Sequence, residues 1–189
     1  MKNHMIIIFL FLILFIVQGC ATPARVDKMV ISPQDIVQHD QNTPLKENTM
    51  VGQVTGGKET NPLWTSQIGD KEFKEALEQS LRAVNLLSNG ENTARYLLHA
   101  NFLSVDQPLI GASFTVSITV QYTLIDNKNK AEIFNEALST PYTAKFGDSI
   151  IAVERLKLAT EGAARVNITK LIEKLYELKI NTGDVSVRG

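Results

Sequence analysis

The clearest pattern in the chain is the strict alternation of apolar and polar residues over 113–125. From 113 to 124 every second position is apolar, and Ser, Thr or Gln fills the positions between them (Phe114, Val116, Ile118, Val120, Tyr122 and Leu124 are the apolar ones). Successive side chains of a strand point to opposite faces of a sheet, so this pattern predicts a strand with one face on the core and the other facing water. Weaker patterns predict strands at 50–54, 96–105 and 131–143, the last interrupted or ended near Pro141.

Two segments have the period of a helix. From Asp70, apolar residues recur at spacings of three and four, which predicts an amphipathic helix (Phe73, Ala76, Leu77, Leu81, Val84 and Leu87). Asp70 is the expected N-cap, and Asn89 or Gly90 is expected to end the helix in the left-handed conformation. A second helix is expected from Asp148 or Ser149 to about residue 178, with small residues that allow close packing (Ala159, Gly162 and Ala163).

The predicted order of elements is strand, helix, strand, strand, strand, helix. This order indicates an α+β fold over residues 49–178, a two-layer sandwich with a mainly antiparallel four-stranded sheet (β-α-β-β-β-α) and two helices on one face. The first strand would join the sheet through a right-handed crossover over the first helix. The Ser- and Thr-rich face of the sheet would be left to solvent or to a partner.

The first twenty residues predict export and lipid attachment. Lys2 precedes an apolar run over 5–17, which is too short to cross a bilayer and typical of a secretory signal. The run ends in Val17-Gln18-Gly19-Cys20, which resembles the bacterial lipobox, although Gln18 departs from the usual small residue. The resemblance implies that residues 1–19 are a signal peptide and that Cys20 is diacylated, with palmitate-type chains, and becomes the first mature residue.

Two further observations extend this interpretation. Cys20 is the only cysteine, so no intramolecular disulfide is expected. Ala21, and not Asp, follows the cysteine. By resemblance to lipoprotein sorting in enterobacteria, this implies that the protein is anchored on the periplasmic side of the outer membrane.

The segments that flank the predicted domain have little regular patterning. Residues 20–48 contain three prolines and many polar residues, so we expect a mostly disordered tether that lets the domain stand off its membrane. As an alternative for one part of it, residues 29–31 would pair with an edge strand. Residues 179–189 are expected to form a flexible tail.

Charge and motifs exclude several classes of function. The chain carries 19 Lys and Arg against 20 Asp and Glu, without a basic cluster, which argues against nucleic acid as a partner. The segment 52–59 resembles a phosphate-binding loop, but Glu59 stands where a Ser or Thr hydroxyl is needed to meet magnesium. His39 and His99 have no cysteine pair or nucleophile pattern beside them, so we expect neither a metal, nor a cofactor, nor an enzyme.

Four residues are candidates for partner binding. Trp64, the only tryptophan, either binds a partner or folds back over the core. Leu109 and Ile110 lie near the tip of a predicted hairpin connection and either dock on protein or lipid or pack over a helix end. Thr119 lies at the centre of the Ser- and Thr-rich sheet face.

The layout resembles a group of bacterial outer-membrane lipoproteins. Cys20, a tether with prolines, the Phe73-x-x-Ala76-Leu77 helix and a long strand ending in residues 122–126 resemble the YajG-like lipoproteins. The layout is also similar to the domains of curli-secretion lipoproteins and of lipoprotein activators of penicillin-binding proteins. The resemblance implies a fold and a compartment, and it implies no catalytic site.

Three functional hypotheses follow from the sequence. The favoured one is a non-enzymatic, lipid-anchored envelope lipoprotein that docks a protein partner, or a second copy of itself, in envelope assembly or maintenance. The docking surface would be the sheet face, an edge strand or the loop at Ile110. The alternative is a periplasmic module that binds a glycan or a lipid, and a hydrolase has the least support.

Overall fold

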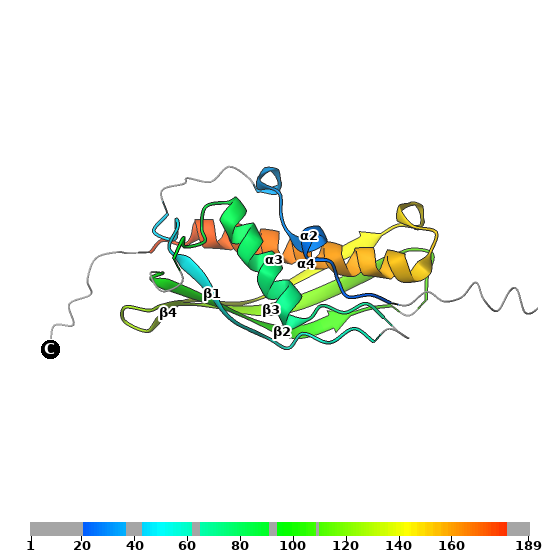
Figure 1. The fold of residues 1–189 in the computed structure, drawn as a ribbon, viewed down its shortest axis with the longest axis horizontal. Coiled ribbons are helices and arrows are strands. Elements are labelled where there is room, and N and C mark those ends of the chain that lie inside the picture. The colour runs from blue at the N-terminus through cyan, green and yellow to red at the C-terminus, as the bar shows by residue number, and fades with distance from the viewer. Residues whose placement is uncertain (1–20, 37–42, 62–64, 91–93, 109, 181–189) are drawn as a thin grey trace, which may run out of the picture.

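The computed structural model describes residues 21–36, 43–61, 65–90, 94–108 and 110–180. Helices lie on one face of a four-stranded sheet, as Figure 1 shows. The strands are β1 (Thr49–Thr55), β2 (Tyr96–Asp106), β3 (Phe114–Asp126) and β4 (Ala131–Ala144). The helices are α2 (Val26–Met29), α3 (Asp70–Ala83) and α4 (Ala152–Glu177), with 3-10 turns η1 (Pro33–Asp35) and η2 (Phe146–Asp148).

The sheet has the order β1-β2-β3-β4, with β1 parallel to β2 and the other neighbours antiparallel. This confirms the predicted α+β fold. The alternation in β3 is also confirmed, since the side chains that point toward the helices are buried. β4 continues through Pro141 to Ala144, because it is an edge strand, where a residue without an N–H group is tolerated.

The helix ends differ from those predicted. Gly69 is the N-cap of α3, and the Oδ1 atom of Asp70 instead accepts a hydrogen bond from Gly57 N at 2.7 Å. α3 ends at Ala83 and the chain turns at Asn85, which has a φ of 59°, so the predicted stop at Asn89 or Gly90 was wrong. The apolar residues at 86 and 87 continue the helical spacing in the sequence, but in the structure they follow the turn and lie beside the start of β1.

The register of α4 on the sheet is set by one close contact and one buried polar network. A Cβ atom on Gly162 would lie 2.2 Å from the Tyr142 ring, so the predicted role of this small residue is confirmed. Asn167 accepts a hydrogen bond from Tyr122 Oη at 2.8 Å and donates to Leu138 O and Thr140 Oγ1. Burial raises the pKa of Tyr122 well above its ordinary value, which keeps its hydroxyl a donor.

The N-terminal segment differs from the predicted tether, because residues 21–36 lie on the helical layer. α2 packs on both α3 and α4, and Met29 and Ile31 are buried. Ile31 N donates to Ser80 Oγ of α3 at 3.2 Å, so residues 29–31 do not pair with an edge strand. The few apolar residues of this segment stand among prolines and polar residues, so the sequence did not predict their burial. They fill the space between α3 and α4 in the helical layer.

One ion pair fixes this segment to α4. The Arg25 guanidinium donates to both carboxylate oxygens of Glu161 at 2.9 and 2.8 Å, and Arg25 N donates to Oε1 at 2.8 Å. The hydrogen bond to Glu161 is the largest cause that raises the pKa of Arg25. The Glu161 side chain is only 1% exposed, and the ion pair with Arg25 offsets the cost of burying it.

Within the described ranges no helix is both long and apolar enough to cross a membrane.

The Arg25–Glu161 pair gives a test of stability. We expect Arg25→Ala to lower the free energy of unfolding by about 3 kcal/mol, because a buried carboxylate loses its partner. Chemical denaturation of the two proteins measures this difference. Glu154→Ala is the matched control, since Glu154 contacts Arg25 at 3.2 Å but is 40% exposed, and should cost less than about 1 kcal/mol. Equal effects of the two substitutions would contradict the assignment.

Candidate partner-binding cleft

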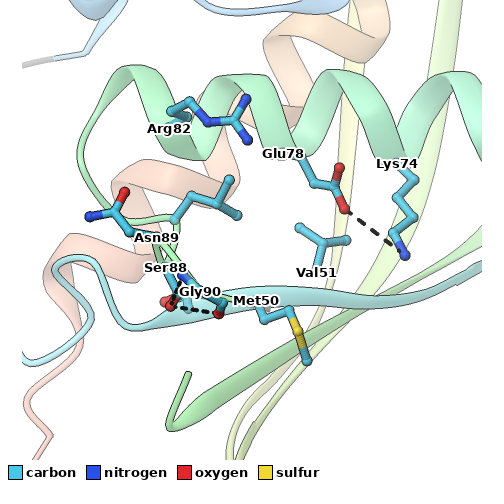
Figure 2. A pocket seen from close by; sticks show the side chains of 10 residues that line it. Met50, Val51, Lys74, Glu78, Arg82, Ser88, Asn89 and Gly90 are labelled. Atoms are coloured by element: carbon cyan, nitrogen blue, oxygen red, sulfur yellow. Dashed lines mark hydrogen bonds and ion pairs between the residues drawn. The ribbon is translucent and has the colours of Figure 1, made fainter. Parts of the chain in front are cut away.

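A hollow lies between α3 and the outer edge of β1 (Figure 2). It holds about 520 Å³ and is lined by Thr49, Met50, Val51, Lys74, Glu78, Arg82, Leu87, Ser88, Asn89 and Gly90. We call it the β1–α3 cleft. A volume of this size is within the usual range for ligand sites, roughly 300–1,000 Å³.

The floor of the cleft is the free edge of β1. At its start, Thr49 N donates to Leu86 O at 3.1 Å and Thr49 O accepts from Ser88 N at 2.8 Å, on the side away from β2. Leu87 therefore pairs with β1 as the first residue of a fifth strand would, but the residues after it do not continue this pairing. Backbone groups alternate in direction along a strand, so the N–H and C=O groups of Val51 point to the same open side as those of Thr49. Within the described ranges no backbone pairs with Val51 on that side.

The wall of the cleft is a charged stripe on α3. Lys74, Glu78 and Arg82 are spaced four residues apart and thus share one face of the helix. Lys74 lies 3.9 Å from Glu78, whereas Arg82 is exposed and has no ion pair among the residues that the structure describes. Figure 2 shows Val51 pointing toward α3 and Met50 away from it. The cleft therefore combines the backbone edge of β1 and the apolar side chains of Val51 and Leu87 with a rim of net positive charge.

A second ion pair supports the end of the sheet where the cleft opens. Arg95 N donates to Asn48 Oδ1 at 2.9 Å, beside the start of β1, and the Arg95 guanidinium donates to Asp126 Oδ2 at 2.7 Å. The hydrogen bond from Arg95 is the main cause that lowers the pKa of Asp126. The Asp126 side chain is 5% exposed. This pair joins the start of β2 to the end of β3. It therefore helps to fix the position of β2, the strand with which β1 pairs.

The predicted Ser- and Thr-rich face exists, and its side chains bond to one another. Thr119 Oγ1 donates to Ser139 Oγ at 3.1 Å across β3 and β4, and Thr115 and Thr143 are joined in the same way at 2.8 Å. Thr119 is thus half-buried in a cross-strand ladder of polar side chains. The ladder satisfies part of the hydrogen-bonding capacity that a ligand would need.

His99 has a structural role on this face. Its Nδ1 atom accepts a hydrogen bond from Gln53 N at 2.9 Å, at a bulge in β1. His99 is half-buried within β2. The segment 52–59, which resembles a phosphate-binding loop in sequence, starts within the edge strand β1. The chain turns after the strand at Gly56, which has a φ of 81°. The hollow beside His99 holds about 130 Å³, well below the usual size of a ligand site.

The other predicted site residues are partly outside the structure. Cys20, Trp64 and Leu109 lie outside the described residues, so their predicted roles stay predictions. Ile110 is 89% exposed and does not pack over a helix end. In the described part of the chain, no group of three or more His, Cys, Asp or Glu side chains is placed to hold a metal ion.

Sequence reasoning named an edge strand as a docking surface, but it missed the cleft. The missed signal was the pair Leu86-Leu87, which continues the spacing of the helix beyond its end. Only the turn at Asn85 makes these residues a neighbour of β1.

Comparisons with known proteins support the fold. No family model and no curated protein matches the chain. Protein XCC0632 from Xanthomonas campestris is similar over 78% of this chain and 94% of its own, with 9% identity and a TM-score of 0.52. A candidate lipoprotein from Caulobacter crescentus is 19% identical over 70% of this chain and 89% of its own, with a TM-score of 0.46.

PelC from Paraburkholderia phytofirmans, crystallised as a dodecamer, is 17% identical over 74% of this chain and 93% of its own, with a TM-score of 0.47. Of these three structures, XCC0632 alone exceeds a TM-score of 0.5. At 9% identity that likeness shows a shared fold.

The Arg95–Asp126 pair predicts a pH dependence of stability. The folded pKa of Asp126 is lowered, so the pair stabilises the protein fully above the ordinary pKa of about 3.9, and this contribution is lost as the pH falls through the folded pKa. We expect Asp126→Asn to lower the free energy of unfolding by about 1–2 kcal/mol at pH 7 and by much less near pH 2. Urea denaturation at both values measures this. Asp27→Asn, at an exposed position, is the control; an equal loss for Asp126→Asn at both pH values would contradict the assignment.

Proposed function

We propose that this protein is a non-enzymatic, lipid-anchored envelope lipoprotein that binds an extended segment of a protein partner in the β1–α3 cleft. Cys20 carries the acyl chains, and the domain lies on the periplasmic side of the outer membrane. The lipobox-like ending at Gly19-Cys20 and the Ala21 that follows it support the anchor and the address. The role is envelope assembly or maintenance.

The observation that carries the proposal is the open edge of β1. An exposed strand edge with unpaired N–H and C=O groups is a template for another strand. Within the described residues, the chain pairs with this edge at Thr49 alone and then turns away, so the edge at Val51 faces the cleft. An extended peptide that continued the line of Leu87 would add a fifth strand there, a recurrent mode of peptide recognition.

The rim of the cleft indicates the chemistry of the segment. An added strand would place alternate side chains on the α3 side of the sheet, near Lys74 and Arg82. Arg82 has no ion pair within the described ranges, and Lys74 is paired with Glu78. An acidic side chain in the bound segment would complement this rim, and an apolar one would cover Leu87.

A glycan or lipid ligand has less support. The hydroxyl groups of the sheet face are bonded across strands, and the hollow beside His99 is small. Binding of such a ligand is therefore an outcome of the test and not a second proposal.

Selection of peptides on the whole protein tests the proposal. A displayed library of random ten-residue peptides should yield sequences that alternate apolar and acidic residues. Hydrogen exchange of the Val51 amide should slow in the complex, because that N–H enters a new ladder, while exchange in the centre of β3 stays unchanged. Arg82→Glu should weaken binding of a selected peptide about tenfold, since one attractive contact becomes repulsive.

Lys170→Glu is the matched control. Lys170 lies on α4, where its Nζ atom is 3.5 Å from Ser139 O of β4, away from the cleft. This charge reversal should leave peptide affinity unchanged. Selected peptides that bind without slowing exchange at Val51, or that lose equal affinity with both charge reversals, would contradict strand addition. Failure to select any peptide, together with binding of peptidoglycan fragments, would favour the glycan alternative.

A further inference from the structure

Four large apolar side chains are exposed at one end of the molecule. Ile110 is 89% exposed, Ile150 81%, Ile151 60% and Phe146 56%. They come from the β2–β3 connection, from η2 and from the segment that leads into α4. We call these four residues the apolar end. Exposed apolar groups gathered in this way mark an interaction surface.

Arg155 joins the three segments that carry the apolar end. Its guanidinium donates to Gly111 O at 3.3 Å and to Ser149 O, next to Ile110 and Ile150 respectively. The same group lies 5.3 Å from the centre of the Phe146 ring. Arg155 itself is 3% exposed, so one buried residue of α4 holds these segments together. The apolar end is therefore part of the rigid domain.

The chain that follows the proposed lipid site is fixed beside this end. Lys157 Nζ donates to Thr22 Oγ1 at 2.6 Å, and Ser66 Oγ donates to Thr22 O at 2.6 Å. Cys20 is two residues before Thr22, so their Cα atoms are at most roughly 7 Å apart. Lys157 is about 9 Å along the helix from Ile151. Figure 1 shows the start of the described chain, the start of α4 and the end of β4 at the same right-hand end.

We propose that the apolar end inserts into the surface of the lipid bilayer that holds the acyl chains of Cys20. This inference rests on the proposed lipidation of Cys20. The acyl chains bring the membrane to the end of the molecule where Ile110, Phe146 and Ile150 are exposed, and these side chains then enter the boundary between headgroups and acyl chains.

The charges near the apolar end argue for insertion by apolar contact. Lys145, just before η2, and Asp148, at its end, are exposed and of opposite charge, and Arg25 contacts Glu154 at 3.2 Å. These exposed charges balance, and the Arg155 guanidinium is buried and bonded to carbonyl oxygens, so anionic lipid offers little extra attraction. Insertion should therefore be equal in vesicles of phosphatidylcholine and in vesicles that contain phosphatidylglycerol.

A fluorescent label on the lipidated full chain tests the proposal. The acylated Cys20 has no free thiol, so an introduced cysteine is labelled alone. Gly147→Cys suits this purpose, because a Cβ atom at Gly147 meets nothing within 4 Å and all four apolar side chains are kept. A polarity-sensitive dye at this position should shift to shorter wavelength in vesicles and be quenched by lipids that carry a nitroxide near the headgroup. Ala131→Cys, at the opposite end of β3 and β4, is the control and should show neither effect.

Matched substitutions separate insertion from simple proximity to the membrane. Ile150→Asp or Ile110→Asp should reduce nitroxide quenching of the dye at position 147 by about half, because a charged side chain resists insertion. Leu103→Asp is the control, since Leu103 is 54% exposed on the sheet face and should leave quenching unchanged.

Each other outcome overturns the inference. No quenching at position 147, or quenching that Ile150→Asp and Ile110→Asp leave unchanged, would mean that the apolar end does not insert. A wavelength shift without nitroxide quenching would mean that protein, such as a second copy of the chain, covers this end. The mass of the N-terminal peptide reports acylation separately, so a failure of lipidation at Cys20 is distinguished from a failure of insertion.

Discussion

The ion pair between Arg25 and Glu161 is the interaction on which the arrangement of this molecule depends. It joins Arg25, near the start of the described residues, to the middle of α4, with three hydrogen bonds of 2.8–2.9 Å. A buried carboxylate is costly without a partner, so the N-terminal segment and α4 stabilise each other. Met29 and Ile31 then close the helical layer that the segment covers. The segment is part of the domain and sets its distance from the proposed anchor.

This constraint gives the domain two different ends. The N-terminal segment leads to the start of α4, where the four residues of the apolar end are exposed. The β1–α3 cleft is lined by the start of β1 and by α3 up to its end. The start of β1 and the end of α3 lie at the left of Figure 1. In the account proposed here, one end contacts lipid and the cleft faces away from the membrane. Such an orientation leaves the free edge of β1 accessible to a partner in the periplasm.

The sequence predicted the sheet and the two long helices because their patterns are long and regular. The eleven residues 114–124 of β3 alternate between apolar and polar without exception, and the stripe of α3 is equally clear. The N-terminal segment could not be predicted, since its burial depends on a few residues that fill a gap between α3 and α4. Its ion pair joins residues 136 positions apart, which no local pattern reveals. The cleft depends in the same way on a turn at Asn85 and on contacts between distant segments.

Neutron reflectometry of the acylated protein on a supported bilayer tests the central claim most directly. If residues 21–36 are fixed to the domain, protein density should begin at the lipid headgroups, with no layer of water between them. A water-rich layer of about 30 Å, the mean reach of a flexible segment of the length first expected from the sequence, would contradict it.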